Sequence, residues 1–133
     1  MKKPRINHIA IAVNDIEHQS KLFADIFGVG ASQPLDLPSQ GVRVVFLEFE
    51  NIMIELIAPL DNAANINKFL QKKGEGLHHL CIATEDIAAT IRELAEKKIE
   101  LIDSEPRPGA HGKPVAFLHP KSTGSVLIEL EED

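Results

Sequence analysis

Apolar residues alternate with polar or small ones in two short segments of the chain, and the two segments resemble each other. They read Asn7-His8-Ile9-Ala10-Ile11-Ala12-Val13 and His78-His79-Leu80-Cys81-Ile82-Ala83-Thr84, aligned at an offset of 79 − 8 = 71 positions. A period of two is typical of a strand with two different faces. We therefore expect two equivalent strands, each with an aliphatic core face. The opposite face, a histidine followed by small residues, suits the wall of a cleft.

Each of these strands is followed by apolar residues at helical spacing. Asp15 and Asp86 stand just before the two predicted helices. Their side-chain oxygens can accept hydrogen bonds from the first N–H groups of a helix. The offset from Ile16 to Ile87 is again 87 − 16 = 71 positions. The predicted apolar faces are Ile16, Leu22, Phe23, Ile26 and Phe27 in the first helix and Ile87, Ile91, Leu94 and Ile99 in the second.

A hairpin is predicted to follow each helix, after a loop rich in proline and glycine. Ile54-Glu55-Leu56 in the first hairpin resembles Ile128-Glu129-Leu130 in the second, at an offset of 129 − 55 = 74 positions. A longer loop in the second copy would account for the drift of three residues. In the first module, the loop covers 31–41, with room for a short extra strand near residue 35, and the hairpin strands cover 42–49 and 52–57. In the second module, the loop covers 103–114 and the hairpin strands cover 115–119 and 125–131.

These elements predict an α+β fold built from two tandem βαβββ modules. We expect them to form a curved mixed sheet around a metal-binding cup. The chain is read as a single domain, 1–133, made of module 1 (1–58), a linker helix (59–76) and module 2 (77–133). The repeat carries this prediction, because a missed duplication misassigns the whole fold.

Each predicted module places a histidine on its first strand and a glutamate on its last strand, both away from the core. Two imidazoles and two carboxylates suit a divalent metal of borderline hardness and leave coordination positions for a substrate. Taken singly, such a histidine is more often structural and such a glutamate more often solvated, but solvation gives no reason for both to recur in register. Alternation favours His79 over His78, which would face the helix side. The candidate ligands are His8, Glu55, His79 and Glu129.

Composition narrows the classes of partner. The net charge of −6 argues against nucleic acid, because neutralising phosphates takes clustered Lys and Arg. No apolar run is long enough to cross a membrane, so no membrane partner is expected. The single Cys81 fits a reducing compartment, and Met1-Lys2-Lys3-Pro4 leads into a strand without a signal-peptide core. We therefore expect a cytoplasmic protein.

Several stretches resemble the vicinal oxygen chelate (glyoxalase/bleomycin resistance/extradiol dioxygenase) superfamily, and within it the methylmalonyl-CoA epimerase branch. The histidine pattern alone indicates the superfamily and its glyoxalase fold. The Gly-Ala-His-Gly-Lys-Pro loop and the Glu-Leu-Ile-Ala-Pro-Leu strand end are more specific to the branch. The matching stretches include Asn7 to Val13, Ile54-Glu55-Leu56-Ile57-Ala58-Pro59-Leu60, Gly76-Leu77-His78-His79-Leu80-Cys81-Ile82, Gly109-Ala110-His111-Gly112-Lys113-Pro114-Val115 and Val126-Leu127-Ile128-Glu129-Leu130.

The resemblance implies a metal-dependent epimerase that interconverts (R)- and (S)-methylmalonyl-CoA by alpha-proton transfer through a metal-stabilised enolate. It implies a divalent ion, Co²⁺ in family enzymes, with Zn²⁺, Mn²⁺ or Ni²⁺ as alternatives. The ion would be held by the four candidate ligands, with Glu129 also catalytic. The family uses glutamine or glutamate at the position of Glu55. An acyl-CoA thioester substrate and a homodimer are also implied.

The chain departs from the branch at Ser39, where the family has a second acid/base glutamate just before a (His/Gln)-Gly-Val stretch. Glu48 or a water could take that role, or the reaction differs. Ser39, His111, Lys113 and Lys121 are candidate substrate contacts, and Arg107 lies near the same loops as the lysines. Two alternatives stay open: a glyoxalase I-type lyase or isomerase of the same fold, and a non-catalytic protein that binds a small molecule.

Overall fold

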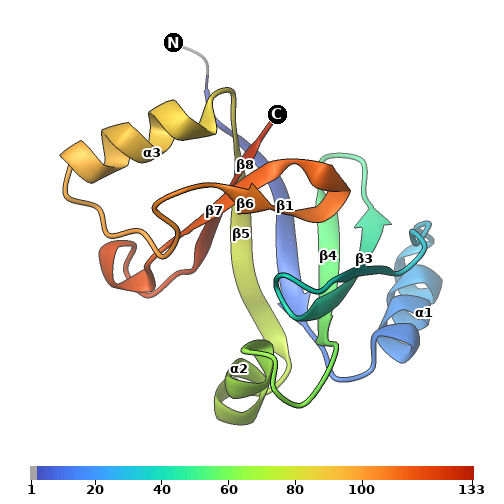
Figure 1. Cartoon of the computed structure of the whole chain (residues 1–133). Coiled ribbons are helices and arrows are strands. Elements are labelled where there is room, and N and C mark those ends of the chain that lie inside the picture. The colour runs from blue at the N-terminus through green and yellow to red at the C-terminus, as the bar shows by residue number, and fades with distance from the viewer. Residues whose placement is uncertain (1–2) are drawn as a thin grey trace. The chain divides into compact units, whose positions relative to one another are not determined.

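The computed structural model describes residues 3–133, and it shows a duplicated arrangement of strands and helices (Figure 1). The chain divides into two compact units, one of residues 8–78 and one of residues 79–133 with the N-terminal segment up to Asn7. The elements in chain order are β1 (Arg5–Ala12), α1 (Ile16–Phe27), β2 (Leu35–Leu37), β3 (Val42–Glu48), β4 (Met53–Pro59), α2 (Ile66–Lys73), β5 (Gly76–Thr84), α3 (Ile87–Glu96), β6 (Arg107–Pro108), the 3-10 turn η1 (Ala110–Gly112), β7 (Pro114–Leu118), the 3-10 turn η2 (Pro120–Ser122) and β8 (Ile128–Glu132).

Both units use the same strand order. In the first, the order is β2-β3-β4-β1, with β1 parallel to β4 and the other neighbours antiparallel. In the second, the order is β6-β7-β8-β5, with β5 parallel to β8 and the other neighbours antiparallel. Two βαβββ modules in an α+β fold, as the repeat predicts, are therefore confirmed.

One helix covers one face of each sheet. Helix α1 lies against β3 and β4 (Figure 1). The core between them includes Val13, Ile16 and Leu56. Helix α3 lies against β7 and β8, and its core includes Ile87 and Leu130. Amphipathic helices bury their apolar stripe in this way, which leaves the other face of each sheet for different chemistry.

The predicted helix starts are confirmed in both modules. The Asp15 carboxylate accepts a hydrogen bond from the His18 N–H at 3.1 Å, and the Asp86 carboxylate accepts one from the Ala89 N–H at 3.0 Å. Helix α1 ends at Gly28, which adopts the left-handed conformation (φ 66°) that favours glycine because it has no Cβ. The side-chain caps and this glycine thus fix the boundaries that the sequence indicates.

The register of the strands explains the drift in the repeat. Glu55 lies opposite Phe46 in the first hairpin, a separation of 55 − 46 = 9 residues. Glu129 lies opposite Phe117 in the second, a separation of 129 − 117 = 12 residues. The three extra residues therefore belong to the β7–β8 connection, as the longer-loop interpretation expects.

Three predicted boundaries are wrong. Residues 103–114 are not loop throughout, because β6 pairs with β7 and η1 follows it. The last strand begins at Ile128 rather than residue 125. The Val126 carbonyl accepts a hydrogen bond from Thr123 Oγ1 in the turn before β8, so it is used in the turn. Ile99 lies beyond the end of α3, although it packs against the same core. Among the described residues, no helix is long and apolar enough to span a membrane.

Candidate functional site

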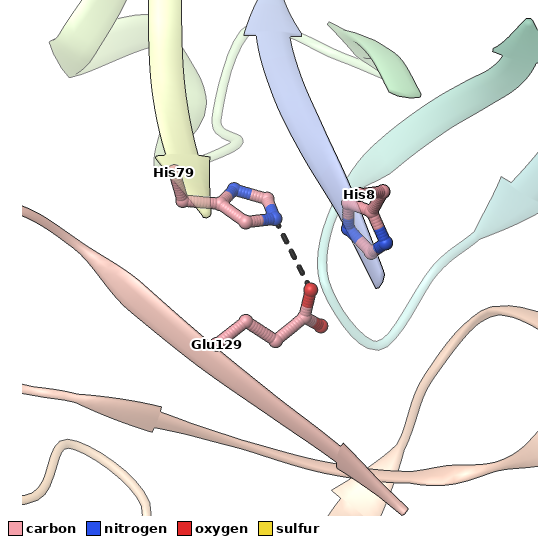
Figure 2. A group of neighbouring side chains, drawn as sticks. All are labelled: His8, His79 and Glu129. Atoms are coloured by element: carbon pink, nitrogen blue, oxygen red, sulfur yellow. Dashed lines mark hydrogen bonds and ion pairs between the residues drawn. The ribbon is translucent and has the colours of Figure 1, made fainter. Parts of the chain in front are cut away.

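The second module holds a buried His–Glu pair on the sheet face opposite α3. His79 on β5 and Glu129 on β8 are each 6% exposed, and His79 Nε2 lies 3.1 Å from Glu129 Oε1. Figure 2 draws this contact as a dashed line and also labels His8, the corresponding histidine of the first module. Glu129 lies opposite Cys81 on the neighbouring strand, so it shares a face with Cys81 and with His79 two residues earlier.

The first module holds the corresponding pair. His8 on β1 is 3% exposed and Glu55 on β4 is 5% exposed, and His8 Nε2 lies 3.7 Å from Glu55 Oε1. Glu55 lies opposite Ala10, which stands two residues after His8, just as Cys81 stands two residues after His79. The two modules therefore place their histidine and glutamate in the same register, through the same imidazole nitrogen.

Each pair has an aromatic neighbour that sequence reasoning missed. The Phe46 ring lies 5.9 Å from the His8 ring at an interplanar angle of 77°, and the Phe117 ring lies 5.3 Å from the His79 ring at 83°. Edge-to-face packing is a favoured arrangement of such ring pairs and restricts the orientation of the imidazole. The signal was present in the sequence, because 117 − 46 = 71 is the offset of the repeat.

The donor set of these residues fits a divalent metal. Each pair offers an imidazole nitrogen and a carboxylate oxygen, which ions of borderline hardness accept. His8, His79 and Glu129 are buried residues of the ligand types that could hold such an ion. Burying charged carboxylates is unfavourable unless a positive group compensates them, and a bound cation supplies that compensation.

A family model for the "Glyoxalase/Bleomycin resistance protein/Dioxygenase superfamily" matches residues 7–117. This chain belongs to that superfamily. The glyoxalase-type fold and the resemblance inferred from the sequence motifs are thereby confirmed.

Individual relatives narrow the similarity within the superfamily. The chain is 46% identical over 132 residues to mouse (Mus musculus) mitochondrial methylmalonyl-CoA epimerase, covering 98% of this chain and 74% of that protein. It is 43% identical over 130 residues to the ethylmalonyl-CoA/methylmalonyl-CoA epimerase of Cereibacter sphaeroides, covering 96% and 97%. A solved methylmalonyl-CoA epimerase in complex with methylmalonyl-CoA and NH4+ superposes with a TM-score of 0.94 at 30% identity, covering 99% of this chain and 96% of that one.

A third carboxylate, that of Glu131, lies on the same face of β8 as Glu129. It is 8% exposed, and the Cys81 thiol donates to its Oε2 at 3.6 Å. Burial, followed by the charges of Glu129 and Glu131, raises the pKa of the Cys81 thiol far above its usual range. The Cys81 thiol is therefore neutral where it donates to Glu131.

The four predicted substrate contacts are exposed, in contrast to the buried pairs. Ser39 lies in the turn after β2, where the Gly41 N–H donates to the Pro38 carbonyl at 3.1 Å. His111 lies in η1 with a positive φ of 64°. Lys113 precedes β7, and the Lys121 N–H donates to His119 Nδ1 at 3.0 Å. Their roles in substrate binding stay predictions.

The neighbouring histidine has a different setting. The His78 ring lies 4.8 Å from the Phe69 ring of α2 at an interplanar angle of 73°. Its side chain therefore faces the helix side, as the alternation of β5 predicts. This leaves His79 as the residue of the His-His sequence that reaches the opposite sheet face.

Proposed function

We propose that this chain is a metal-dependent epimerase that interconverts (R)- and (S)-methylmalonyl-CoA. The observation that carries the proposal is the similarity to methylmalonyl-CoA epimerases, 46% identical across 98% of the chain for the mouse protein. The buried His–Glu pair in each module supports it, since such pairs are costly to fold and useful for chemistry.

The proposed metal ligands are His8, Glu55, His79 and Glu129, one pair from each module. A divalent ion held there, Co²⁺ in our proposal, would supply a Lewis acid that stabilises negative charge on the thioester oxygen. The histidines contribute neutral nitrogens, and Phe46 and Phe117 restrict the orientation of their rings. The two glutamates contribute the negative charge that balances the ion.

Epimerisation also needs proton transfer at the carbon next to the thioester. The proton must leave one face of that carbon and return to the other, so an acid/base is needed on each side. Glu129 is the proposed acid/base for one face, because its carboxylate lies on the buried sheet face beside His79. Ser39 stands where the family has the second glutamate, and its hydroxyl would position substrate or a water molecule.

Ser39 is exposed and stands at the position of the family's glutamate, which favours a second function as an alternative to the proposal. A glyoxalase I-type isomerase would use the same four ligands on a hemithioacetal, without a glutamate at this position. A protein that merely binds a small molecule would need no metal for its function.

Deuterium exchange at C2 of methylmalonyl-CoA in D2O distinguishes these functions. The protein is assayed after loading with Co²⁺ and after stripping with a chelator. Metal-dependent exchange with interconversion of the epimers is the expected result. Exchange without interconversion would mean that Glu129 works alone on one face. No exchange by the loaded protein would contradict the epimerase proposal, and turnover of a hemithioacetal would then support the alternative.

We also propose that the enzyme is a cytoplasmic homodimer. The single buried Cys81 is compatible with a reducing compartment, although the mouse relative is mitochondrial by name. Light scattering after size-exclusion chromatography tests the assembly, and a mass of one chain, 14.6 kDa, would contradict it.

A further inference from the structure

Arg107 on β6 contacts the phenylalanine ring that packs against His79. Its guanidinium lies 5.6 Å from the centre of the Phe117 ring, and the centre of that ring lies 5.3 Å from that of His79. On its other side, Arg107 Nε lies 3.3 Å from Asp103 Oδ1. One aromatic ring therefore separates this cation from the imidazole proposed to bind the metal.

Asp103 contacts both Arg107 and the backbone of β7. Its Oδ2 accepts a hydrogen bond from the Phe117 N–H at 2.9 Å, while its Oδ1 faces Arg107. A single carboxylate thus fixes the backbone that carries the Phe117 ring and the guanidinium that stacks on it. A planar guanidinium held in this way loses little further freedom when it binds a ligand.

The register places Arg107 on the sheet face that carries the glutamates. Arg107 lies opposite Val115, and Val115 lies opposite Glu131. Directly opposed residues of antiparallel strands share a face, and Glu131 shares its face with Glu129 two residues away. The α3 core uses the other face, through Ala116, Leu118 and Leu130.

The remaining donors of Arg107 are available. Its side chain is 36% exposed, and its ion pair with Asp103 uses Nε, not the terminal nitrogens. Arginine in this setting is suited to bidentate contacts with a carboxylate or phosphate.

We propose that Arg107 binds an anionic group of the acyl-CoA substrate, with Asp103 as its positioning residue. The inference rests on the proposed function and names a substrate contact for it. Methylmalonyl-CoA carries two kinds of such groups, the carboxylate of the acyl part and the phosphates of the CoA part. Both present the oxygen pairs that a guanidinium recognises.

The test measures substrate binding and turnover separately. KM and kcat for methylmalonyl-CoA are determined for the Co²⁺-loaded wild type, Arg107→Ala, Arg107→Lys and Arg43→Ala. Calorimetry on the metal-stripped proteins then gives the affinity for methylmalonyl-CoA and for methylmalonyl-pantetheine, which keeps the carboxylate but lacks the phosphates of the nucleotide part. Arg43 is a matched control, since it is an exposed arginine paired with Asp36 in the other module.

We expect Arg107→Ala to raise KM and weaken binding by about ten- to a hundredfold, as for the loss of a charged hydrogen bond, with a smaller change in kcat. Arg107→Lys should recover part of the loss, and Arg43→Ala should behave like wild type. Weaker binding of both thioesters would identify the carboxylate as the partner. Weaker binding of the CoA thioester alone would identify the phosphates.

An Arg107→Ala protein that binds both thioesters like wild type would overturn the inference. If the wild type were then still an epimerase, the proposed function would stand without it. If the wild type bound the thioesters but did not epimerise them, the proposed function would fail, and the comparison of affinities would still decide the role of Arg107. A Co²⁺-loaded wild type that neither bound nor epimerised methylmalonyl-CoA would contradict both.

Discussion

The buried ionisable side chains are the residues that most need a physical reason. In the part of the chain that the structure describes, the buried polar or charged residues are His8, Glu55, His79, Glu129 and Glu131. Each glutamate carries a desolvation cost, and replacing a buried ion pair by apolar residues is often neutral or stabilising. The His–Glu pairs of this set are expensive for folding and recur in both modules, and the chemistry that they perform best explains them.

The two proposed carboxylate ligands should respond differently to the same substitution. Glu129→Gln should lower epimerase activity by about 10²- to 10⁴-fold, because an amide oxygen can still bind a metal but cannot exchange a proton. Glu55→Gln should keep most of the activity, since Glu55 is proposed only as a ligand and an amide oxygen can still bind a metal. Activity and bound cobalt are measured for both variants.

The pair of variants also contains its own control. If Glu129→Gln lost activity only because it lost the metal, its cobalt content would fall together with its rate. Equal loss of activity in both variants at full cobalt content would contradict the assignment of Glu129 as the acid/base.

For single residues, the sequence predicts the candidate metal ligands better than it predicts the side chains around them. His79 and Glu129 follow from alternation and repetition, because both signals are local or pairwise in the sequence. Glu131 reads as a solvated strand end, and only the tertiary structure shows its burial against Cys81. Phe117 matched the repeat offset, but an aromatic residue in an apolar strand does not stand out until its ring is seen beside His79.

Helix capping is the clearest duplicated feature among the secondary-structure elements. Asp15→Ala and Asp86→Ala should each lower the free energy of unfolding by about 1 kcal/mol, because each removes an acceptor for an N–H group that has no partner inside the helix. Urea unfolding monitored by circular dichroism measures the change. Asp15→Ser and Asp86→Ser should restore most of it, and a loss equally large in the serine variants would point to a cause other than capping.

The edge strand β2 is held by a cross-strand ion pair that depends on pH. Asp36 lies opposite Arg43 and accepts hydrogen bonds from its Nε at 2.7 Å and its Nη2 at 3.2 Å. The hydrogen bond from Arg43 lowers the pKa of Asp36 below its usual 3.8. The pair therefore contributes its full stabilisation above the unfolded-state pKa and loses it as the pH falls through the folded-state pKa.

A nuclear magnetic resonance titration of the Asp36 carboxyl carbon tests this effect. In the wild type, the midpoint should lie below 3.8, the ordinary value for this group. In Arg43→Ala, it should move back towards that value, because the donor that favours the charged form is gone. An identical midpoint in the two proteins would show that Arg43 does not control this carboxylate.

The element boundaries show where local sequence signals stop. Both helix starts and the end of α1 are each specified by a capping residue next to that end of the helix. Such signals are local, so the sequence predicts these boundaries. Strand β6 has only two residues, and its existence depends on pairing with β7. A proline- and glycine-rich stretch gives no local sign of such a partner, which is why residues 103–114 read as a loop.

The duplication is the property of the whole chain that gives these details a common meaning. Both modules repeat the strand order, the register of the glutamate and the contact of a histidine with a phenylalanine. The shared pattern extends to the helix caps, where 86 − 15 = 71 is again the offset. Each module therefore carries one imidazole and one carboxylate, the donor types of the proposed four-ligand metal site.

The proposed four-ligand site predicts how many metal ions each chain binds. Each chain should bind one equivalent of Co²⁺, and either His8→Ala or His79→Ala alone should abolish tight binding, because each removes a nitrogen ligand of the same ion. Equilibrium dialysis followed by metal analysis measures the bound cobalt. His78→Gln is the matched control, since it changes the neighbouring histidine, which packs against Phe69, and should leave one equivalent bound.

Separate sites in the two modules would give a different outcome. The wild type would then bind two equivalents, and each single histidine variant would keep one. Thermal unfolding gives a second measurement, because an ion that binds only the folded protein stabilises it by about 2.7 kcal/mol at a free concentration of 100 times its Kd. With one shared ion, either histidine variant should lose the entire cobalt-dependent rise in melting temperature. A variant that kept half of it would show that the modules bind metal independently.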